Sequence, residues 1–262
     1  MNIKLVITDL DGTLLNDKKE INQEFWPVHQ QLIKKGIIFS VASGRQLYSL
    51  TNKFHNIKDD TLFIAENGTV VNYKGEQLLI KPLPFSDTVN FINVARQIPE
   101  TGIVLCGLNS AYIENSHPQF QKEAGKYYYR LKKVNDLTQV NDTILKLAIY
   151  DFKNAEQNSY PVFESYHNRF KIAISGQEWM DIAHYTATKG AAVSKIQKQL
   201  GILPEETMVF GDYLNDMEMM AVSDYSYAMK NAHPEILKAA RYITEKDNNE
   251  NGVVETLKKQ LL

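Results

Sequence analysis

The sequence predicts an α/β fold, with a doubly wound, Rossmann-like parallel sheet as the core and a second α+β domain inserted into it. Near both ends of the chain, continuous apolar runs alternate with amphipathic stretches, as in parallel strands buried on both faces. In the middle, apolar and polar residues alternate singly, as in strands with one buried face. We therefore assign residues 1–82 and 187–262 to the core, and residues 83–186 to the inserted domain.

The first part of the chain predicts a strand, a helix and two further strands. The apolar run 3–7 forms the first strand, and apolar residues at helical spacing between 25 and 33 form the helix. Gly36 can adopt the left-handed conformation that ends a helix. The runs 37–42 and 61–65 form the next two strands.

A β-hairpin and a linker are expected next. Residues 69–73 and 77–80 flank the turn pair Lys74-Gly75, which predicts the hairpin. Prolines at 82 and 84 then form the linker to the inserted domain.

The inserted domain is predicted to be an antiparallel sheet that helices cover on one side. The alternating apolar positions that indicate its strands are Leu145, Leu147, Ile149, Phe170, Ile172 and Ile174. We expect the aromatic run 127–129 and Trp179 to pack in the core of this domain.

The last part of the chain returns to the pattern of the first. Apolar residues at helical spacing from 193 to 200 predict a helix that ends at Gly201. A strand at 207–210 and shorter strands at 225–229 and 241–244 complete the sheet.

The composition points to a cytoplasmic protein that binds neither nucleic acid nor membrane. Its formal net charge of −2 provides no broad positive field. No apolar stretch approaches the ~20 residues that cross a bilayer, and the apolar start lacks the basic region of a signal peptide. The lone Cys106 fits a reducing compartment. We expect a monomer or a homodimer.

Polar residues follow three of the predicted parallel strands and would meet at one edge of the sheet. They are Asp9, Asp11, Ser43, Asp212, Asn215 and Asp216, with Gly44 next to Ser43. Gathering several carboxylates is costly unless a cation is present or one carboxyl keeps its proton. Mg²⁺ suits them because it binds one or two carboxylates, several waters and a phosphate oxygen. The six histidines are scattered, so they do not favour a softer metal.

The same edge of the sheet suits a phosphate group. Ser43 can donate its hydroxyl, and backbone N–H groups around Gly44, near a helix start, can cradle an anion. Lys189 begins a later helix and offers a mobile cation. With phosphate charge neutralised in this way, a carboxylate can act as a nucleophile.

Two neighbouring residues have two interpretations each. Arg45 can contact substrate or form a structural ion pair in a first helical turn. Asn67 can line the cleft, or it can serve the tight turn for which the pair Asn67-Gly68 is suited.

Taken together, these motifs resemble the haloacid-dehalogenase superfamily, and in particular its Cof-type phosphatases with a large α/β cap (C2, type B). The resemblance spans essentially the whole chain, with the cap inserted between the second and third motifs. The four motifs are Asp9-Leu10-Asp11-Gly12-Thr13-Leu14, Ser43-Gly44-Arg45, Lys189-Gly190, and Gly211-Asp212 followed by Asn215-Asp216.

The resemblance implies a Mg²⁺-dependent phosphatase that forms an aspartyl-phosphate. Asp9 would be the nucleophile, and Asp11 would protonate the leaving oxygen and then activate water. Asp9, the backbone carbonyl of Asp11 and Asp212 would hold Mg²⁺, with Asp216 in the inner or second coordination sphere.

The remaining motif residues would serve the substrate. Ser43, Gly44 and Lys189 would bind the phosphate, and Asn215 would orient Lys189 or the phosphate. The cap would close over the cleft and contact the leaving group. Small phosphorylated metabolites are the implied substrates, with sugar phosphates leading and nucleotide and cofactor phosphates such as pyridoxal phosphate behind.

Other functions are compatible with parts of the pattern. A phosphotransferase or sugar-phosphate mutase would use the same Asp9 but pass the phosphoryl group to a hydroxyl. A receiver-like signalling domain, or a phospholigand-binding module without catalysis, would also combine acidic residues with a lysine. The inserted domain and the Ser43-Gly44-Arg45 motif count against a receiver.

Overall fold

A computed structural model describes residues 2–262, and internal contacts divide them into two compact units. The first unit comprises residues 2–44, 54–79 and 188–262, and the second comprises residues 45–53 and 80–187. Each unit contains its own sheet, so the predicted α/β class with a second, inserted α+β part is confirmed. The functional domain boundaries at 82 and 186 stay a prediction.

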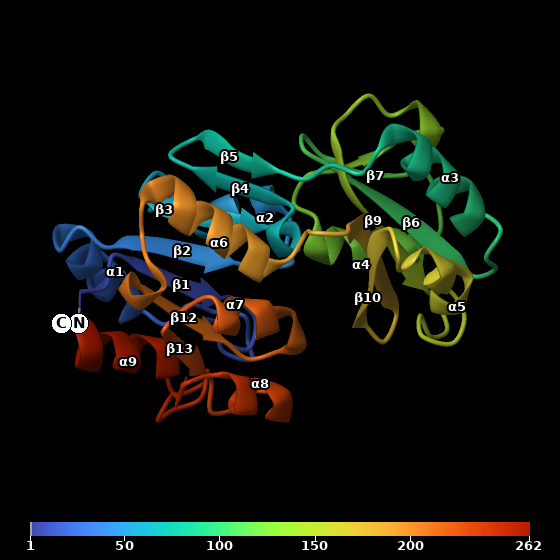
Figure 1. The fold of residues 1–262 in the computed structure, drawn as a ribbon. Coiled ribbons are helices and arrows are strands. Elements are labelled where there is room, and N and C mark those ends of the chain that lie inside the picture. The colour runs from blue at the N-terminus through green and yellow to red at the C-terminus, as the bar shows by residue number, and fades with distance from the viewer. Residues whose placement is uncertain (1) are drawn as a thin grey trace. The chain divides into compact units, whose positions relative to one another are not determined.

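The first unit is built on a mostly parallel sheet with the strand order β14-β13-β12-β1-β2-β3-β4-β5 (Figure 1). Pairings are parallel from β14 to β3, and β4 pairs antiparallel with β3. Its strands are β1 (Leu5–Asp9), β2 (Ile38–Ala42), β3 (Thr61–Ala65), β4 (Val70–Tyr73), β5 (Glu76–Ile80), β12 (Thr207–Gly211), β13 (Tyr225–Ala228) and β14 (Tyr242–Ile243).

The order of the strands brings three of the predicted motifs to one edge of this sheet. Strand β1 lies between β12 and β2, with Asp9 opposite Ala42 and Thr8 opposite Phe210. Because these pairings are parallel, the residues that follow β1, β2 and β12 leave the sheet at the same end.

The helices of the first unit form two groups by their contacts. They are α1 (Phe25–Lys34), α6 (Lys189–Leu200), α7 (Met217–Ala221), α8 (Pro234–Ala239) and α9 (Gly252–Leu261). Helix α1 contacts α9, whereas α7 contacts α6 and α8. The chain runs from β1 to β2 and β3 in one direction along the sheet, and from β12 to β13 and β14 in the other. Because such crossovers are right-handed, α1 and α9 lie on one face of the sheet and α6, α7 and α8 on the other, as expected for a doubly wound sheet.

Local signals in the sequence fix several element ends. Gly36 and Gly201 have φ values of 73° and 64°, so both adopt the left-handed conformation predicted for a residue after a helix. Thr188 caps α6, because its Oγ1 accepts a hydrogen bond from Ala191 N at 3.0 Å. Lys74 and Gly75 both have positive φ in the turn between β4 and β5, as a two-residue hairpin loop requires.

The second unit is an α+β structure around the sheet β10-β11-β9-β6-β7-β8. Its strands are β6 (Thr101–Gly107), β7 (Ala111–Ile113), β8 (Leu131–Lys133), β9 (Ile144–Asp151), β10 (Phe170–Gly176) and β11 (Trp179–His184). Its helices are α2 (Leu47–Lys53), α3 (Phe85–Ala95), α4 (Pro118–Tyr127) and α5 (Tyr160–Phe163). Among residues 2–262, no helix is long and apolar enough to cross a membrane.

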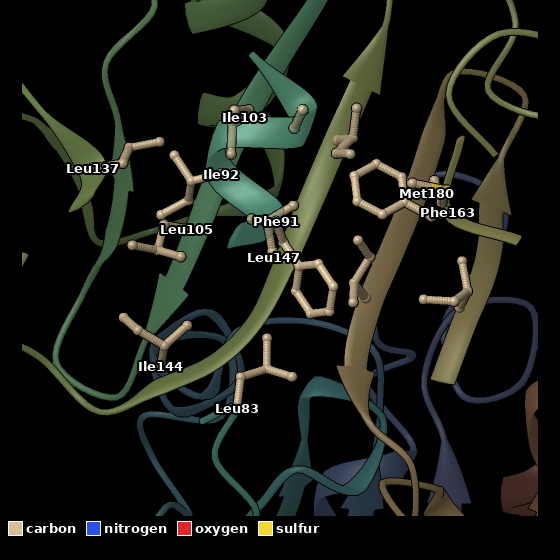
Figure 2. Close-up of a cluster of buried hydrophobic side chains, with 14 of the residues drawn as sticks. Leu83, Phe91, Ile92, Ile103, Leu105, Leu137, Ile144, Leu147, Phe163 and Met180 are labelled. Atoms are coloured by element: carbon tan, nitrogen blue, oxygen red, sulfur yellow. The ribbon is translucent and has the colours of Figure 1, made fainter. Parts of the chain in front are cut away.

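Both faces of the second sheet are covered, which corrects the prediction of helices on one side. Figure 2 shows one core, in which Phe91 and Ile92 of α3 and Phe163 of α5 pack on β6, β9 and β11. A second buried cluster joins Phe120 and Ala124 of α4 to the other face of β6 and β9. Strand β9 is consequently buried along its whole length.

Three side chains of the second unit lie outside the core that the sequence predicted for them. Ile174 is exposed next to a register shift between β10 and β11. Tyr127 and Tyr129 are exposed, whereas Tyr128 between them is buried as predicted. The spacing of aromatic residues was therefore a poor guide to burial in this run.

His29 on α1 should make the stability of the protein depend on pH. The ring is 2% exposed, its Nε2 has no hydrogen-bond partner among the described residues, and it packs on Phe25 and Phe39. Burial lowers the pKa of His29, although the charge of Asp60 opposes this. As the pH falls, His29 in the unfolded chain therefore takes up a proton near its ordinary pKa of about 6.5, whereas His29 in the folded chain takes it up only at a lower pH.

We expect the folded state to lose stability as the pH falls below about 6.5, and His29→Phe to lose less, because phenylalanine cannot take up that proton. Urea unfolding of both proteins above and below this pH measures the difference. Equal losses in the two proteins would contradict the assignment to His29.

Candidate active site

Lys189 lies at the centre of a buried cluster of charges in the first unit. It is the first residue of α6, is fully buried, and its Nζ donates to Asp9 Oδ1 at 2.5 Å and to Asp216 Oδ1 at 2.7 Å. The expected mobile cation is thus fixed between two carboxylates. A buried lysine requires such partners, because an unpaired charge is very costly away from water.

Asp216 also shapes the loop that follows β12. Its Oδ2 accepts hydrogen bonds from the backbone N–H groups of Asp212 at 3.0 Å and Tyr213 at 3.3 Å. Asp216 is fully buried at the end of a short 3-10 helix, Leu214–Asp216. Both of its oxygens are thus engaged within the protein.

Asp212 comes close to the loop that follows β1. Thr13 Oγ1 donates to Asp212 Oδ1 at 2.8 Å. Gly12 has φ of 79°, and a Cβ at this position would lie only 2.4 Å from Asp212 Oδ2. The glycine of the first motif is therefore required both by its backbone conformation and by the approach of the carboxylate.

Two carboxyl groups of this cluster, Asp9 and Asp212, resist ionisation. Burial raises the pKa of Asp9 well above its usual value, against the opposing effect of Lys189, and the nearby charges of Asp216 and Asp212 raise it further. Burial also raises the pKa of Asp212 to about 6. For Lys189, burial would lower the pKa, but the attraction of Asp216 and Asp9 outweighs it and the pKa is raised.

The donors in this cluster fit a hard divalent cation. Asp9, Asp212 and Asp216 each offer a carboxylate oxygen, and these atoms lie within 4.8 Å of one another. Lys189 supplies one positive charge against three carboxylates, so a further cation would relieve the remaining repulsion. Oxygen-only donors of this kind favour Mg²⁺ over softer metals.

The second motif reaches the same region through the segment after β3. Asn67 N donates to the backbone carbonyl of Ser43 at 3.0 Å, and a Cβ on Gly44 would lie 3.1 Å from Asn67 Nδ2. Asn215 Nδ2 in turn donates to Asn67 Oδ1 at 3.1 Å. Asn67 has φ of 55°, so it serves a tight turn and also lies beside the second and fourth motifs.

The backbone of this turn lies against the start of α6. Gly68 has φ of 90°, and a Cβ there would lie 2.2 Å from the carbonyl oxygen of Thr188. The absence of a side chain at Gly68 thus allows the turn after β3 to approach the residue that precedes Lys189.

Asp11 lies apart from the carboxylate cluster. Its side chain is 37% exposed, and Lys19 Nζ lies 3.0 Å from its Oδ1. A solvent-exposed ion pair of this kind contributes little to stability. Asp9, in contrast, is buried and held by Lys189.

The sequence interpretation gave no role in the site to three residues that organise this region. Thr13 was noted only as part of a motif, and Lys19 gave no signal. Asn231 Nδ2 donates to the carbonyl of Gly12 at 2.9 Å, so it supports the first loop across a long chain separation. Arg45 belongs by contacts to the second unit, and its role stays a prediction.

Comparison with known proteins gives consistent matches over nearly the full chain. A family model described as haloacid dehalogenase-like hydrolase matches residues 6–257. The chain is 33% identical to the 5-amino-6-(5-phospho-D-ribitylamino)uracil phosphatase YbjI of Escherichia coli (strain K12), over 100% of this chain and 97% of that protein. It is 24% identical to the 5-amino-6-(5-phospho-D-ribitylamino)uracil phosphatase YcsE of Bacillus subtilis (strain 168), over 100% of this chain and 97% of that protein. A crystal structure from Eubacterium rectale superposes with a TM-score of 0.90 at 32% identity over 99% of both chains.

Removing the central cation should destabilise the first unit strongly. We expect Lys189→Met to lower the free energy of unfolding by about 3–5 kcal/mol, because it leaves buried carboxylates without their partner. The matched control is Lys195→Met on the exposed side of the same helix, which should change it by less than about 0.5 kcal/mol. Urea unfolding in metal-free buffer measures both. Similar small effects in the two variants would show that the ion pairs at Lys189 do not stabilise the fold.

Proposed function

Since this chain belongs to the haloacid dehalogenase-like hydrolase family and is a phosphatase of that family, we propose that it is a cytoplasmic, Mg²⁺-dependent phosphomonoesterase that acts on small metabolites through an aspartyl-phosphate on Asp9. The family membership confirms the resemblance inferred from the four motifs.

The proposal rests chiefly on the contacts of Lys189. This lysine holds Asp9 through one hydrogen bond and Asp216 through another, next to Asp212 and at the carboxyl ends of parallel strands. A fixed carboxylate among cation-binding groups suits attack on a phosphoryl group, since positioning and charge neutralisation provide most of the catalysis of phosphoryl transfer.

Asp9, Asp212 and the backbone carbonyl of Asp11 are the residues that would hold Mg²⁺. Asp216 is better placed for an outer position, because its oxygens already accept hydrogen bonds from Lys189 and from two backbone N–H groups. When bound, the ion would offset the repulsion between the attacking carboxylate and the phosphate.

In the first proposed step, a carboxylate oxygen of Asp9 attacks phosphorus, and the bond from phosphorus to the ester oxygen breaks. Asp11 gives its proton to that leaving oxygen. Ser43, the backbone N–H of Gly44 and Lys189 would bind the other phosphate oxygens, with Asn215 and Asn67 supporting them. Arg45 would contact the substrate.

In the second proposed step, water attacks the phosphorus of the aspartyl-phosphate. Asp11 is then a carboxylate and accepts a proton from that water, which restores Asp11 and frees Asp9 and inorganic phosphate. The ion pair between Lys19 and Asp11 would have to open in each cycle, and the exposure of both side chains permits this.

The relatives suggest which esters to test first. YbjI and YcsE are both named as phosphatases of 5-amino-6-(5-phospho-D-ribitylamino)uracil, and this chain is 33% and 24% identical to them. That compound carries its phosphate on a sugar-derived polyol chain. We therefore propose sugar and polyol phosphates as the preferred substrate class, with this compound at the head of a panel that also includes nucleotides and pyridoxal phosphate.

Asp9→Asn should abolish phosphate release, because it keeps the size of the side chain and removes its nucleophilic charge. Release of inorganic phosphate from the panel is measured with Mg²⁺ or with EDTA, and EDTA should also stop the reaction. The control variant Asp59→Asn, at an exposed position, should keep the rate of the unmodified protein. Undiminished turnover in Asp9→Asn would exclude this nucleophile, and absence of turnover with every ester would contradict the proposed activity.

Asp11→Asn should slow the hydrolysis of the phosphoryl-enzyme by about 10²–10⁴-fold, the usual contribution of a general acid–base group. An activated ester that needs no protonation, such as an aryl phosphate, should then leave Asp9 phosphorylated. Intact-protein mass spectrometry tests this by comparing Asp11→Asn with the double variant Asp9→Asn/Asp11→Asn. Only the single variant should gain the mass of a phosphoryl group. Transfer of the phosphoryl group to an added sugar instead of water would favour the phosphotransferase alternative.

A further inference from the structure

Helix α2 is fastened to the segment between α4 and β8 through paired hydrogen bonds. Gln46, just before α2, accepts from Arg130 N through Oε1 at 3.0 Å and donates to Arg130 O through Nε2 at 3.0 Å. Ser49 donates to Tyr127 O at 3.0 Å and accepts from Tyr129 N at 3.2 Å. The side chains of Gln46 and Ser49 thus imitate the backbone pairing of a β-strand.

Burial and a stacking contact strengthen this attachment. Gln46 is 3% exposed, so its two hydrogen bonds are shielded from competition with water. The guanidinium carbon of Arg130 lies 3.5 Å from the centre of the Tyr48 ring. A cation over an aromatic ring at this distance adds to the attraction between α2 and the same segment. All of these contacts lie within the second unit.

The residues just before α2 are held in the first unit instead. Ser43 N donates to Ile64 O at 2.8 Å, and Ser43 O accepts from Asn67 N at 3.0 Å. The chain passes from one unit to the other between Gly44 and Arg45. Only Arg45 therefore separates Gly44, at the end of the first unit, from Gln46.

We propose that Gln46 is a positioning residue for the phosphate-binding segment Ser43-Gly44. The segment is hydrogen-bonded to the first unit at Ser43, and Gln46, two residues after Gly44, is hydrogen-bonded to Arg130, so the backbone is restrained on both sides of Gly44. Loss of the Gln46 anchor frees the side after Gly44, so that part of the binding free energy of phosphate goes into ordering the segment. This inference rests on the proposed function, in which Ser43 and Gly44 bind phosphate.

The coupling has to be reciprocal. If the attachment of Gln46 to Arg130 favours phosphate binding, then bound phosphate favours the attachment by the same factor. The amides of Tyr129 and Arg130 report on the attachment directly, because their hydrogen bonds are made to Ser49 and Gln46. Phosphate together with Mg²⁺ should therefore slow hydrogen exchange of these amides.

The main test compares two substitutions that each remove a side-chain amide bonded to two backbone groups. Gln46→Leu removes the pairing with Arg130. The matched control Asn115→Leu removes a donor to Thr101 O at 3.2 Å and an acceptor from His117 N at 2.8 Å, elsewhere in the second unit. Inorganic phosphate is titrated into each protein by calorimetry in the presence of Mg²⁺.

We expect Gln46→Leu to raise the dissociation constant of phosphate about threefold to tenfold, the loss expected for one or two hydrogen bonds, and Asn115→Leu to leave it unchanged. In Gln46→Leu, KM for the preferred ester should rise along with the dissociation constant of phosphate, whereas kcat should change less. Gln46→Glu keeps the acceptor for Arg130 N but loses the donor, so its effect should be intermediate. Equal changes in Gln46→Leu and Asn115→Leu would show a general effect on the second unit and overturn the inference.

Hydrogen exchange separates failure of this inference from failure of the proposed function. Phosphate that leaves the Tyr129 and Arg130 amides of the unmodified protein unaffected overturns the coupling, even if the protein releases phosphate from esters. If phosphate slows the exchange of these amides in the unmodified protein but not in Gln46→Leu, the coupling is supported, even if no ester in the panel is turned over.

Discussion

The ion pairs of Lys189 are the interaction on which the rest of the site depends. A lysine with no exposed surface exists only if carboxylates surround it, and here Asp9 and Asp216 provide them at hydrogen-bonding distance. The same lysine lowers the cost of burying those carboxylates. Since these residues come from β1, the start of α6 and the loop after β12, the cluster also ties distant parts of the first unit together.

The cluster is not fully compensated by the protein itself, and this has a functional meaning. Three carboxylates face one buried lysine, and burial holds the pKa of Asp9 and Asp212 above their usual values. A site that served stability alone would be served as well by apolar residues. Residual negative charge of this kind is instead suited to a cation, as in our proposal that Mg²⁺ binds here together with the phosphate.

Much of the fold and the composition of the site followed from the sequence, because both depend on local pattern. Continuous apolar runs marked the parallel strands, and polar residues directly after them marked the edge where Asp9, Ser43 and Asp212 belong. Contacts between distant segments left no such trace. The burial of Lys189, the support of Gly12 by Asn231 and the second helical layer of the inserted unit all depend on which segments meet in three dimensions.

The path of the chain between the units adds a constraint that the motifs alone do not express. The chain leaves the first unit directly after Ser43-Gly44, re-enters it at residue 54, leaves again after residue 79, and returns at Thr188, directly before Lys189. Two of the segments proposed to bind phosphate are therefore covalently next to a crossing, and each is anchored on its first-unit side, Ser43 to β3 and Lys189 to Asp9 and Asp216. In our proposal, a change in the hydrogen bonds of Gln46 within the second unit reaches Ser43-Gly44 through a few backbone bonds. This route needs no separate network of side chains between distant sites.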